Sequence, residues 1–237
     1  MRFYRRLSPI KAMTFDLDDT LYDNRPIIRR VESEITQWLH HQYPISATKP
    51  YSWWQQVKLD VAKVDPMLKH DVTRWRFEQV KHGLALLGLE QAQATLAAKA
   101  TIEKVLVLRS QFDVPSETHR VLNQLSERYP LVAITNGNVD VSKIGLDVYF
   151  SLTLKAGPDG RAKPSPDLFS KASDFLNIAP KHTLHVGDHL ITDVAGAKRN
   201  GFQACWYNDQ GSNLMQHPRS RTLPDVEISQ LDSLLSL

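Results

Sequence analysis

Short apolar runs that lack an alternating pattern constrain the fold of this 237-residue chain more than any other feature. The runs are Ala12–Phe15, Leu131–Thr135, Thr183–Val186 and Ala204–Tyr207, with Phe150–Leu154 as a weaker candidate. Continuous apolar runs of this length are typical of parallel strands, because helices cover both faces of a parallel sheet. They therefore predict a buried parallel sheet.

Helical patterns lie between these runs. Ser116–Tyr129 carries apolar residues at helical spacing, and Ser165–Asn177 begins with a serine in the N-cap position followed by a proline. Ile191–Asn200 reads as a short helix that Gly201 ends. Strands that alternate with helices predict an α/β fold, a doubly wound parallel sheet of the Rossmann-like type.

The stretch from residue 24 to residue 113 differs, because it contains no convincing strand. Apolar residues at helical spacing follow Asn24, Asp71 can cap a further helix that Gly88 ends, and Leu89–Leu108 continues the helical character. We expect four or five helices inserted after the first strand. The core domain would comprise residues 1–22 and 114–237, and the helical cap domain residues 23–113.

Two short segments, Asp23–Arg25 and Asp113–Pro115, are the expected hinges between these domains. A chain of this length can bury one good-sized core and a smaller second domain.

Composition excludes several classes of protein. The net charge is only +3 and the lysines and arginines are scattered, which argues against a nucleic-acid partner. No apolar stretch approaches the roughly 20 residues of a membrane span, and no signal-peptide pattern is present. Cys205 is the only cysteine, so we expect a buried free thiol and a reducing environment. These features predict a cytoplasmic protein, either a monomer or a homodimer, with no membrane partner.

Three aspartates, Asp16, Asp18 and Asp19, follow the first apolar run directly, with Thr20 after them. The carboxyl edge of an open α/β sheet is where ligands bind. Carboxylates this close repel one another unless a cation lies among them, and oxygen ligands suit Mg²⁺. The alternative is a solvated acidic turn.

Phosphate-binding residue types follow the second strand and precede a later helix. Thr135, Asn136 and Gly137 can form a turn whose hydroxyl, amide and backbone N–H groups hold phosphate oxygens. Lys163 can supply a positive charge to a phosphoryl group. Taken singly, a capped turn explains the first group equally well, and a solvated surface lysine explains Lys163 better.

Further acids follow the fourth predicted strand. Gly187 permits a close backbone approach, and Asp188 would lie at the same edge of the sheet as Asp16. Asp193 can cap the following helix or act as an acid behind the metal. We expect His185 to pack in or near its strand and His189 to line the mouth of the site.

Taken together, these residues resemble the four motifs of the haloacid-dehalogenase-like superfamily of phosphohydrolases. The matching set is Asp16, Asp18 and Thr20, then Thr135, then Lys163, then Gly187, Asp188 and Asp193. The resemblance extends over the predicted core, and the insertion resembles the helical cap of the dehalogenase-type branch.

The resemblance implies a chemical role for each residue. Asp16 would be the nucleophile and become an aspartyl phosphate. Asp18 would protonate the leaving oxygen and then take a proton from the hydrolytic water, and its carbonyl would bind Mg²⁺. Thr135 and Lys163, with Asn136 beside them, would hold the phosphoryl oxygens.

The remaining residues would support that chemistry. Asp188 would bind Mg²⁺ directly, Asp193 would support the metal and the lysine, and Thr20 would brace the loop. The implied substrate is a small phosphorylated metabolite.

Several alternatives share parts of this pattern. A true dehalogenase needs neither a proton donor for a halide nor a divalent metal, so Asp18 and Asp188 argue against it. A phosphoacceptor regulatory domain lacks the long helical insertion. A phosphomutase or a broad sugar-phosphate phosphatase has the same core residues and stays open.

The cap segment Asp71–Phe77 is similar to that of bacterial phosphatases acting on flavin mononucleotide (FMN) and on the ribitylaminouracil phosphate of riboflavin synthesis. A helix turns about 100° per residue. We therefore expect Arg74 or Trp75, not both, to face the substrate. The alternative is that Trp75 belongs to the cap core.

Overall fold

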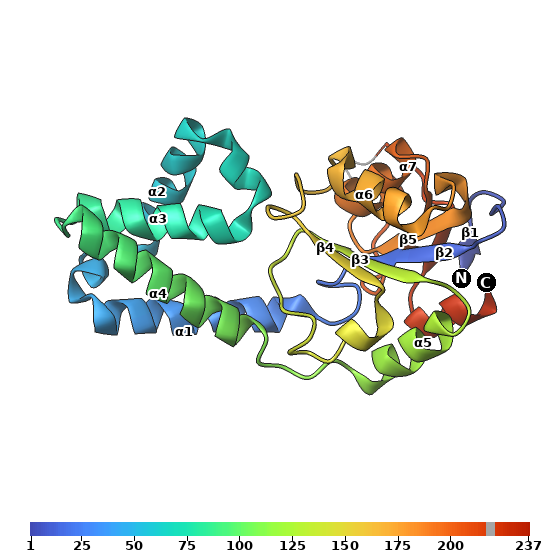
Figure 1. Cartoon of the computed structure of the whole chain (residues 1–237), viewed down its shortest axis with the longest axis horizontal. Helices are drawn as coiled ribbons and strands as arrows, with labels where there is room; N and C mark the ends of the chain where they lie inside the picture. Colours follow the sequence, from blue (N-terminus) through green and yellow to red (C-terminus); the bar gives the residue numbers. More distant parts are fainter. Residues whose placement is uncertain (217–220) are drawn as a thin grey trace.

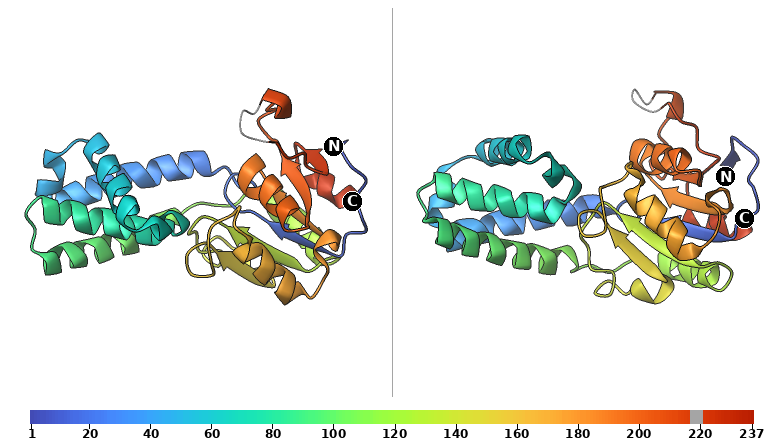
Figure 2. Two further views of the ribbon diagram at one scale, coloured as in Figure 1. Left: turned by 90° about the horizontal axis from the view of Figure 1, so that it is seen from above. Right: turned by 45° about the horizontal axis from the view of Figure 1, so that its top comes forward.

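The computed structural model describes residues 1–216 and 221–237. A layered α/β lobe lies to one side of a lobe made only of helices (Figure 1). Both chain ends lie in the α/β lobe, on the side away from the helices (Figures 1 and 2). None of the helices among the described residues is long and apolar enough to cross a membrane.

Seven strands form one sheet in the order β1-β7-β6-β5-β2-β3-β4. The strands are β1 (Arg2–Phe3), β2 (Ala12–Phe15), β3 (Leu131–Thr135), β4 (Leu152–Lys155), β5 (Thr183–Gly187), β6 (Gln203–Tyr207) and β7 (Val226–Ile228). Neighbouring strands are parallel except for the edge pair of β1 and β7. The predicted parallel sheet is therefore confirmed, and all five apolar runs contribute strands.

Two strands were not expected, and one run begins later than expected. β1 and β7 contain two and three residues, too few for an apolar pattern to be recognised. A short helical turn, Asp147–Tyr149, precedes Phe150, so β4 begins at Leu152.

Helices cover both faces of the sheet (Figure 2). α5 (Ser116–Ser126) lies against one face, and α6 (Pro166–Leu176) and α7 (Gly196–Arg199) lie against the other. Residues of β3 alternate between the two apolar cores: Leu131 belongs to the α5 side and Val132 to the α6 side. Burial on both faces explains why the strands read as continuous apolar runs.

The central strand β2 determines where a ligand can bind. It pairs with β3 on one side and with β5 on the other, so the strand order reverses at β2. In an open α/β sheet, the ligand site lies beyond the carboxyl ends of the strands at such a reversal. The ends of β2, β3 and β5 therefore define the candidate site.

Four α-helices and two short 3-10 turns make up the helical lobe, which we call the cap. They are α1 (Asn24–Gln42), the turn Pro44–Thr48, α2 (Tyr51–Val64), the turn Pro66–His70, α3 (Val72–Leu86) and α4 (Gln91–Arg109). Asp71 caps α3 as predicted, because its carboxylate accepts hydrogen bonds from the backbone of Thr73 and Arg74 at 3.0 and 2.9 Å. Gly88 follows α3 with a φ of +102°.

The amino-terminal end of α3 touches the α/β lobe. Asn138 Nδ2 donates a hydrogen bond to Thr73 Oγ1 at 3.1 Å. Gly157, in the loop after β4, lies so close to Asp71 that an added Cβ would be 2.5 Å from the Asp71 Cγ. These contacts place the start of α3 beside the loops that follow β3 and β4.

Gly157→Ala should therefore loosen the contact between the cap and the α/β lobe. Gly88→Ala is the matched control, because Gly88 also has a positive φ but has no atom within 4 Å of an added Cβ. We expect limited proteolysis to cut near Asp23–Arg25 and Asp113–Pro115 faster in Gly157→Ala than in Gly88→Ala. Equal rates would show that backbone strain, not lost docking, governs both variants.

Candidate active site

Asp16 directly follows β2 and continues its pairing with β5, because its backbone N–H donates to the Val186 carbonyl at 2.9 Å. The chain then turns sharply. The backbone of Asp19 has a φ of +59°, and its N–H donates to the Tyr22 carbonyl at 2.9 Å. This turn holds Asp16 and Asp18 at the carboxyl end of the central strand.

A buried lysine joins the ends of two strands. Lys163 Nζ lies 2.8 Å from Asp16 Oδ1 and 2.6 Å from Asp193 Oδ1, and its side chain is 1% exposed. Burial alone would lower the pKa of Lys163, but the two carboxylates outweigh it and raise that pKa. Lys163 is therefore a fixed cation, not the solvated lysine of the alternative interpretation.

A neutral histidine, His185, also contacts Asp193. His185, in β5, contacts Thr14 Oγ1 through Nδ1 at 2.8 Å and Asp193 Oδ1 through Nε2 at 3.3 Å. Burial lowers the pKa of His185, which favours the neutral ring. Nε2–H then donates to the carboxylate while Nδ1 accepts from the threonine. Burial opposes the charged form of Asp193, but Lys163 and His185 outweigh it and lower the Asp193 pKa.

Asp193 does not cap the following helical turn, which was one of its two expected roles. The turn Leu190–Ala195 is wider than an α-helix and is capped by His189, whose Nδ1 accepts from the backbone of Ile191 and Thr192 at 3.3 and 3.1 Å. Asp193 Oδ2 accepts from the His189 backbone N–H at 3.0 Å, while its Oδ1 is held by Lys163 and His185.

Negative charge is in excess at the ends of β2 and β5. Oxygens of Asp16, Asp188 and Asp193 lie within 4.8 Å of one another, and Lys163 is the only lysine or arginine among the described residues that pairs with them. Burial raises the pKa of Asp16 well above its usual value. Burial, followed by the charges of Asp193 and Asp19, raises the pKa of Asp188 to about 7. A donor set made only of carboxylate oxygens with surplus negative charge fits a hard divalent cation.

Thr20 lies against Asp188. Its Oγ1 accepts from the Asp188 backbone N–H at 3.1 Å and approaches Asp188 Oδ1 at 3.4 Å. Trp206 Nε1 donates to the Asp188 carbonyl at 2.7 Å. These contacts orient the carboxylate toward the cluster.

The loop after β3 lies against Asp18. Thr135 Oγ1 accepts from the Gly137 backbone N–H at 2.9 Å. An added Cβ at Gly137 would lie 2.5 Å from Asp18 Oδ2, so only glycine permits this approach. The side chain of Asn136 bonds both backbone groups of Lys163, accepting from N–H at 2.8 Å and donating to the carbonyl at 3.0 Å. Asn136 thus positions the lysine.

Asp18 has two partners that the sequence did not indicate. Arg109, the last residue of α4, forms an ion pair with Asp18 Oδ1. The hydroxyl of Tyr22 donates to the same oxygen at 2.7 Å. The arginine is 91 positions away in sequence, so no local motif connects it to Asp18.

The two candidate substrate readers on α3 are both engaged within the cap. Trp75 Nε1 donates to the Lys58 carbonyl at 2.7 Å, and the Lys58 ammonium lies 4.7 Å from the centroid of the indole ring. Arg74 pairs with Asp65 at 2.8 Å, and its side chain is 56% exposed. Cys205, as expected, is buried and free.

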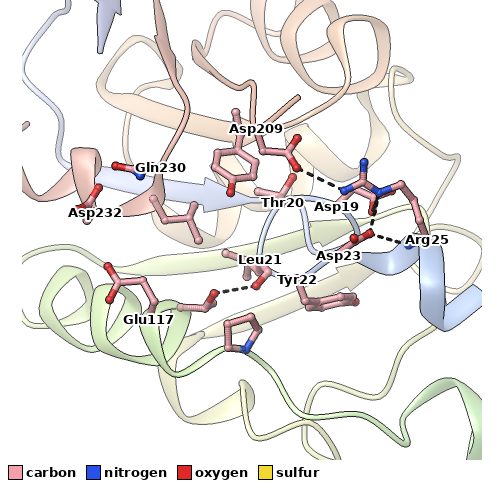
Figure 3. A pocket seen from close by; sticks show the side chains of 14 residues that line it. Asp19, Thr20, Leu21, Tyr22, Asp23, Arg25, Glu117, Asp209, Gln230 and Asp232 are labelled. Carbon is pink, nitrogen blue, oxygen red and sulfur yellow. Dashed lines mark hydrogen bonds and ion pairs between the residues drawn. The ribbon is translucent and has the colours of Figure 1, made fainter. Parts of the chain in front are cut away.

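A cavity of about 430 Å³ lies beside the turn that follows Asp18 (Figure 3). Asp19, Tyr22, Arg25 and Asp209 are among the residues that line it, and both expected hinges border it. The charged cluster at the strand ends does not line this cavity. Thr20, which contacts Asp188, is the one residue of the proposed motifs that borders the cavity.

Comparison with known proteins identifies the class. The profile of the haloacid dehalogenase-like hydrolases matches residues 10–201. The chain belongs to this family, which confirms the resemblance found in the sequence motifs.

Several individual proteins are similar to this chain over nearly its whole length. The chain is 46% identical, over 100% of both proteins, to the 5-amino-6-(5-phospho-D-ribitylamino)uracil phosphatase YigB of Escherichia coli. It is 25% identical to a glyceraldehyde 3-phosphate phosphatase of Pyrococcus furiosus, over 96% of this chain and 92% of the relative. A crystal structure of a 2-haloacid dehalogenase from Pseudomonas syringae superposes with a TM-score of 0.89 and 35% identity, over 96% and 97% of the two chains.

Asp193→Ala should destabilise the fold strongly, because it leaves Lys163 with one partner and His185 without its acceptor. Breaking a buried ion pair by removing one partner costs about 3–5 kcal/mol, which urea unfolding would measure. The control is Asp167→Ala, since the ion pair of Asp167 with Arg161 is exposed to solvent and screened. Equal losses in the two variants would argue against Lys163 as the central cation.

Proposed function

We propose that this chain is a Mg²⁺-dependent phosphatase that hydrolyses a small phosphate monoester through an aspartyl phosphate on Asp16. One observation carries the proposal. Asp16 and Lys163 form a buried ion pair at the carboxyl end of the central strand, and Asp188 presents its carboxylate within 4.8 Å of the same cluster. Phosphoryl transfer requires this combination of a positioned nucleophile and fixed charges.

The reaction would proceed in two steps. An Asp16 oxygen attacks phosphorus, and the bond to the ester oxygen breaks as Asp18 gives that oxygen a proton. Water then attacks the aspartyl phosphate and yields a proton to Asp18, which releases inorganic phosphate and restores Asp16. Thr135 and Lys163, with backbone N–H groups of the loop after β3, would hold the phosphoryl oxygens.

Asp16 and Asp188, with the backbone carbonyl of Asp18, would hold the metal ion. A bound Mg²⁺ would offset the repulsion between the Asp16 carboxylate and the phosphate group. Asp193 would stay with Lys163 and His185, and Thr20 would keep Asp188 in place.

Dehalogenation is the second candidate, favoured by the 35% identity to the Pseudomonas syringae structure. Two features of this chain support phosphate esters instead. Asp18 provides a proton donor, which a departing halide does not need, and Asp188 adds to an acidic cluster suited to a cation. The 46% identity to a phosphatase points in the same direction.

The proposed substrates are ribitylaminouracil phosphate, as in the name of the Escherichia coli relative, and FMN. Both are primary phosphate esters of a ribityl chain attached to a ring. Residues of the cap would bind the ring and thereby determine specificity. Arg74 is the better candidate of the two predicted contact residues, because 56% of its side chain is exposed and its ion pair with Asp65 is at the surface. The indole N–H and one ring face of Trp75 are already occupied.

Phosphate release from a panel of esters, with chloride release from a 2-chloroacid beside it, would test this function. We expect phosphate release only, and Asp16→Asn should abolish it because an amide cannot form the phosphoenzyme. Arg74→Ala should reduce kcat/KM for FMN by about tenfold or more, roughly 1.4 kcal/mol, and hardly affect a small ester. Wild-type rates in folded Asp16→Asn would refute the mechanism.

Mg²⁺ binding should strengthen with rising pH. The pKa of Asp188 is raised to about 7 in the metal-free protein, so its carboxyl group is protonated below that pH and ionised above it. The proton must leave before a cation binds, so the two compete. We expect Mg²⁺ to raise the melting temperature little at about pH 6 and considerably at about pH 8, and Asp188→Asn to remove this difference. Asp167→Asn should retain it, because Asp167 pairs with Arg161 outside the cluster. Equal stabilisation at both pH values in the wild type would contradict the assignment of Asp188.

The predicted domain limits, the cytoplasmic location and the monomeric or homodimeric state belong to this proposal as predictions. They rest on the insertion pattern, the single free thiol and the ordinary charge balance of the chain.

A further inference from the structure

The carboxylate of Asp18 is held by one oxygen only. Arg109 and Tyr22 both bind Oδ1, and no other side chain among the described residues bonds the carboxylate. The second oxygen, Oδ2, lies against Gly137, where the missing side chain leaves room. The two oxygens of Asp18 are therefore inequivalent in the folded chain.

The guanidinium of Arg109 is buried, with 3% of its side chain exposed. Its Nη1 makes no hydrogen bond to the described residues. Burial of a charge is costly unless the charge is paired, so Asp18 supplies the main compensation for burying this arginine. Such a pair is expected to hold a fixed geometry.

The position of Arg109 depends on the cap, because it is the last residue of α4. Arg30, on α1, donates from Nη2 to the carbonyls of Leu108 and Gln111 at 3.1 and 2.8 Å. Ser110 Oγ accepts from the Asp140 backbone N–H at 3.2 Å, which ties the start of the linker to the α/β lobe. The end of α4 therefore lies at a defined place beside the turn that carries Asp18.

We propose that Arg109 is a positioning residue for Asp18, which links the orientation of the proton donor to the docking of α4 against the α/β lobe. The inference rests on the proposed phosphatase function. Arg109 and Tyr22 hold Oδ1, which leaves Oδ2 as the oxygen available for proton transfer. In the proposed reaction, Oδ2 gives a proton to the ester oxygen as its bond to phosphorus breaks, and later accepts a proton from water.

This arrangement makes proton transfer conditional on the cap. Movement of α4 away from the core by a few ångströms would separate the guanidinium from Oδ1 and leave the carboxyl group free to rotate. Lids in many enzymes complete the catalytic arrangement only when closed. Here the arginine at the end of the last cap helix performs that step.

A comparison of two leaving groups tests the proposal on the full-length enzyme with Mg²⁺. 4-Nitrophenolate leaves readily without a proton, whereas the alkoxide of a primary alkyl phosphate such as glycerol 3-phosphate requires one. We expect Arg109→Gln to lower kcat/KM for the alkyl ester at least tenfold more than for 4-nitrophenyl phosphate. kcat/KM is the suitable measure because it reports the steps up to phosphoenzyme formation.

Two further variants test the contacts to Asp18 Oδ1. Tyr22→Phe removes only one hydrogen bond and should show the same leaving-group preference to a smaller extent, even if Arg109→Gln folds poorly. Arg109→Lys keeps the positive charge but lacks the planar guanidinium. It should retain part of the alkyl-ester activity that Arg109→Gln loses.

Arg76→Gln is the matched control, because Arg76 forms a comparable partly buried ion pair with Glu32 inside the cap. It should change kcat/KM for both esters by the same factor. Equal losses on both esters in Arg109→Gln and Tyr22→Phe, or no loss in either, would overturn the proposal. Failure of the wild-type enzyme to release phosphate from any ester would instead refute the phosphatase function.

Discussion

The arrangement of this site depends on one buried cation, Lys163, held between Asp16 and Asp193. The pair joins the end of β2 to the turn after β5, and Asn136 holds the lysine backbone from the end of β3. Three strand ends are thus tied together by charge and hydrogen bonds. Removing either carboxylate would break one of the two buried ion pairs of Lys163 that connect these strand ends.

The same cluster explains both the raised pKa values at the site and the importance of glycine near it. One lysine cannot neutralise three carboxylates, and burial raises the pKa of Asp16 and Asp188. Close packing of the acids requires backbone without side chains beside them. Gly187 lies directly against Asp193, and Gly137 lies against Asp18.

Local sequence patterns predicted many of the strands and helix ends correctly. The run Ala12–Phe15 is a strand that is buried at every residue, as its largely apolar sequence without alternation predicted. Asp71 caps α3 because a short acidic side chain before a helix can accept from its first N–H groups. Asp193 is not the N-cap residue that one of its two expected roles required, although its carboxylate accepts from the backbone N–H of the N-cap residue His189. Capping is judged from neighbours in the sequence, whereas Asp193 is held by a lysine 30 positions away, and His189 took its place.

The amino-acid sequence alone predicts the parallel sheet, the helical insertion and the acids at the strand ends. It can do so because periodicity and motif spacing are local properties of the chain. The partners of those acids arise only in the folded molecule. Arg109 reaches Asp18 because α1 leads out to the cap and α4 returns beside it, and that approach depends on helix packing and the linkers. Pairing between distant residues is a property of three-dimensional proximity, so the geometry of Asp18 is decided by the fold.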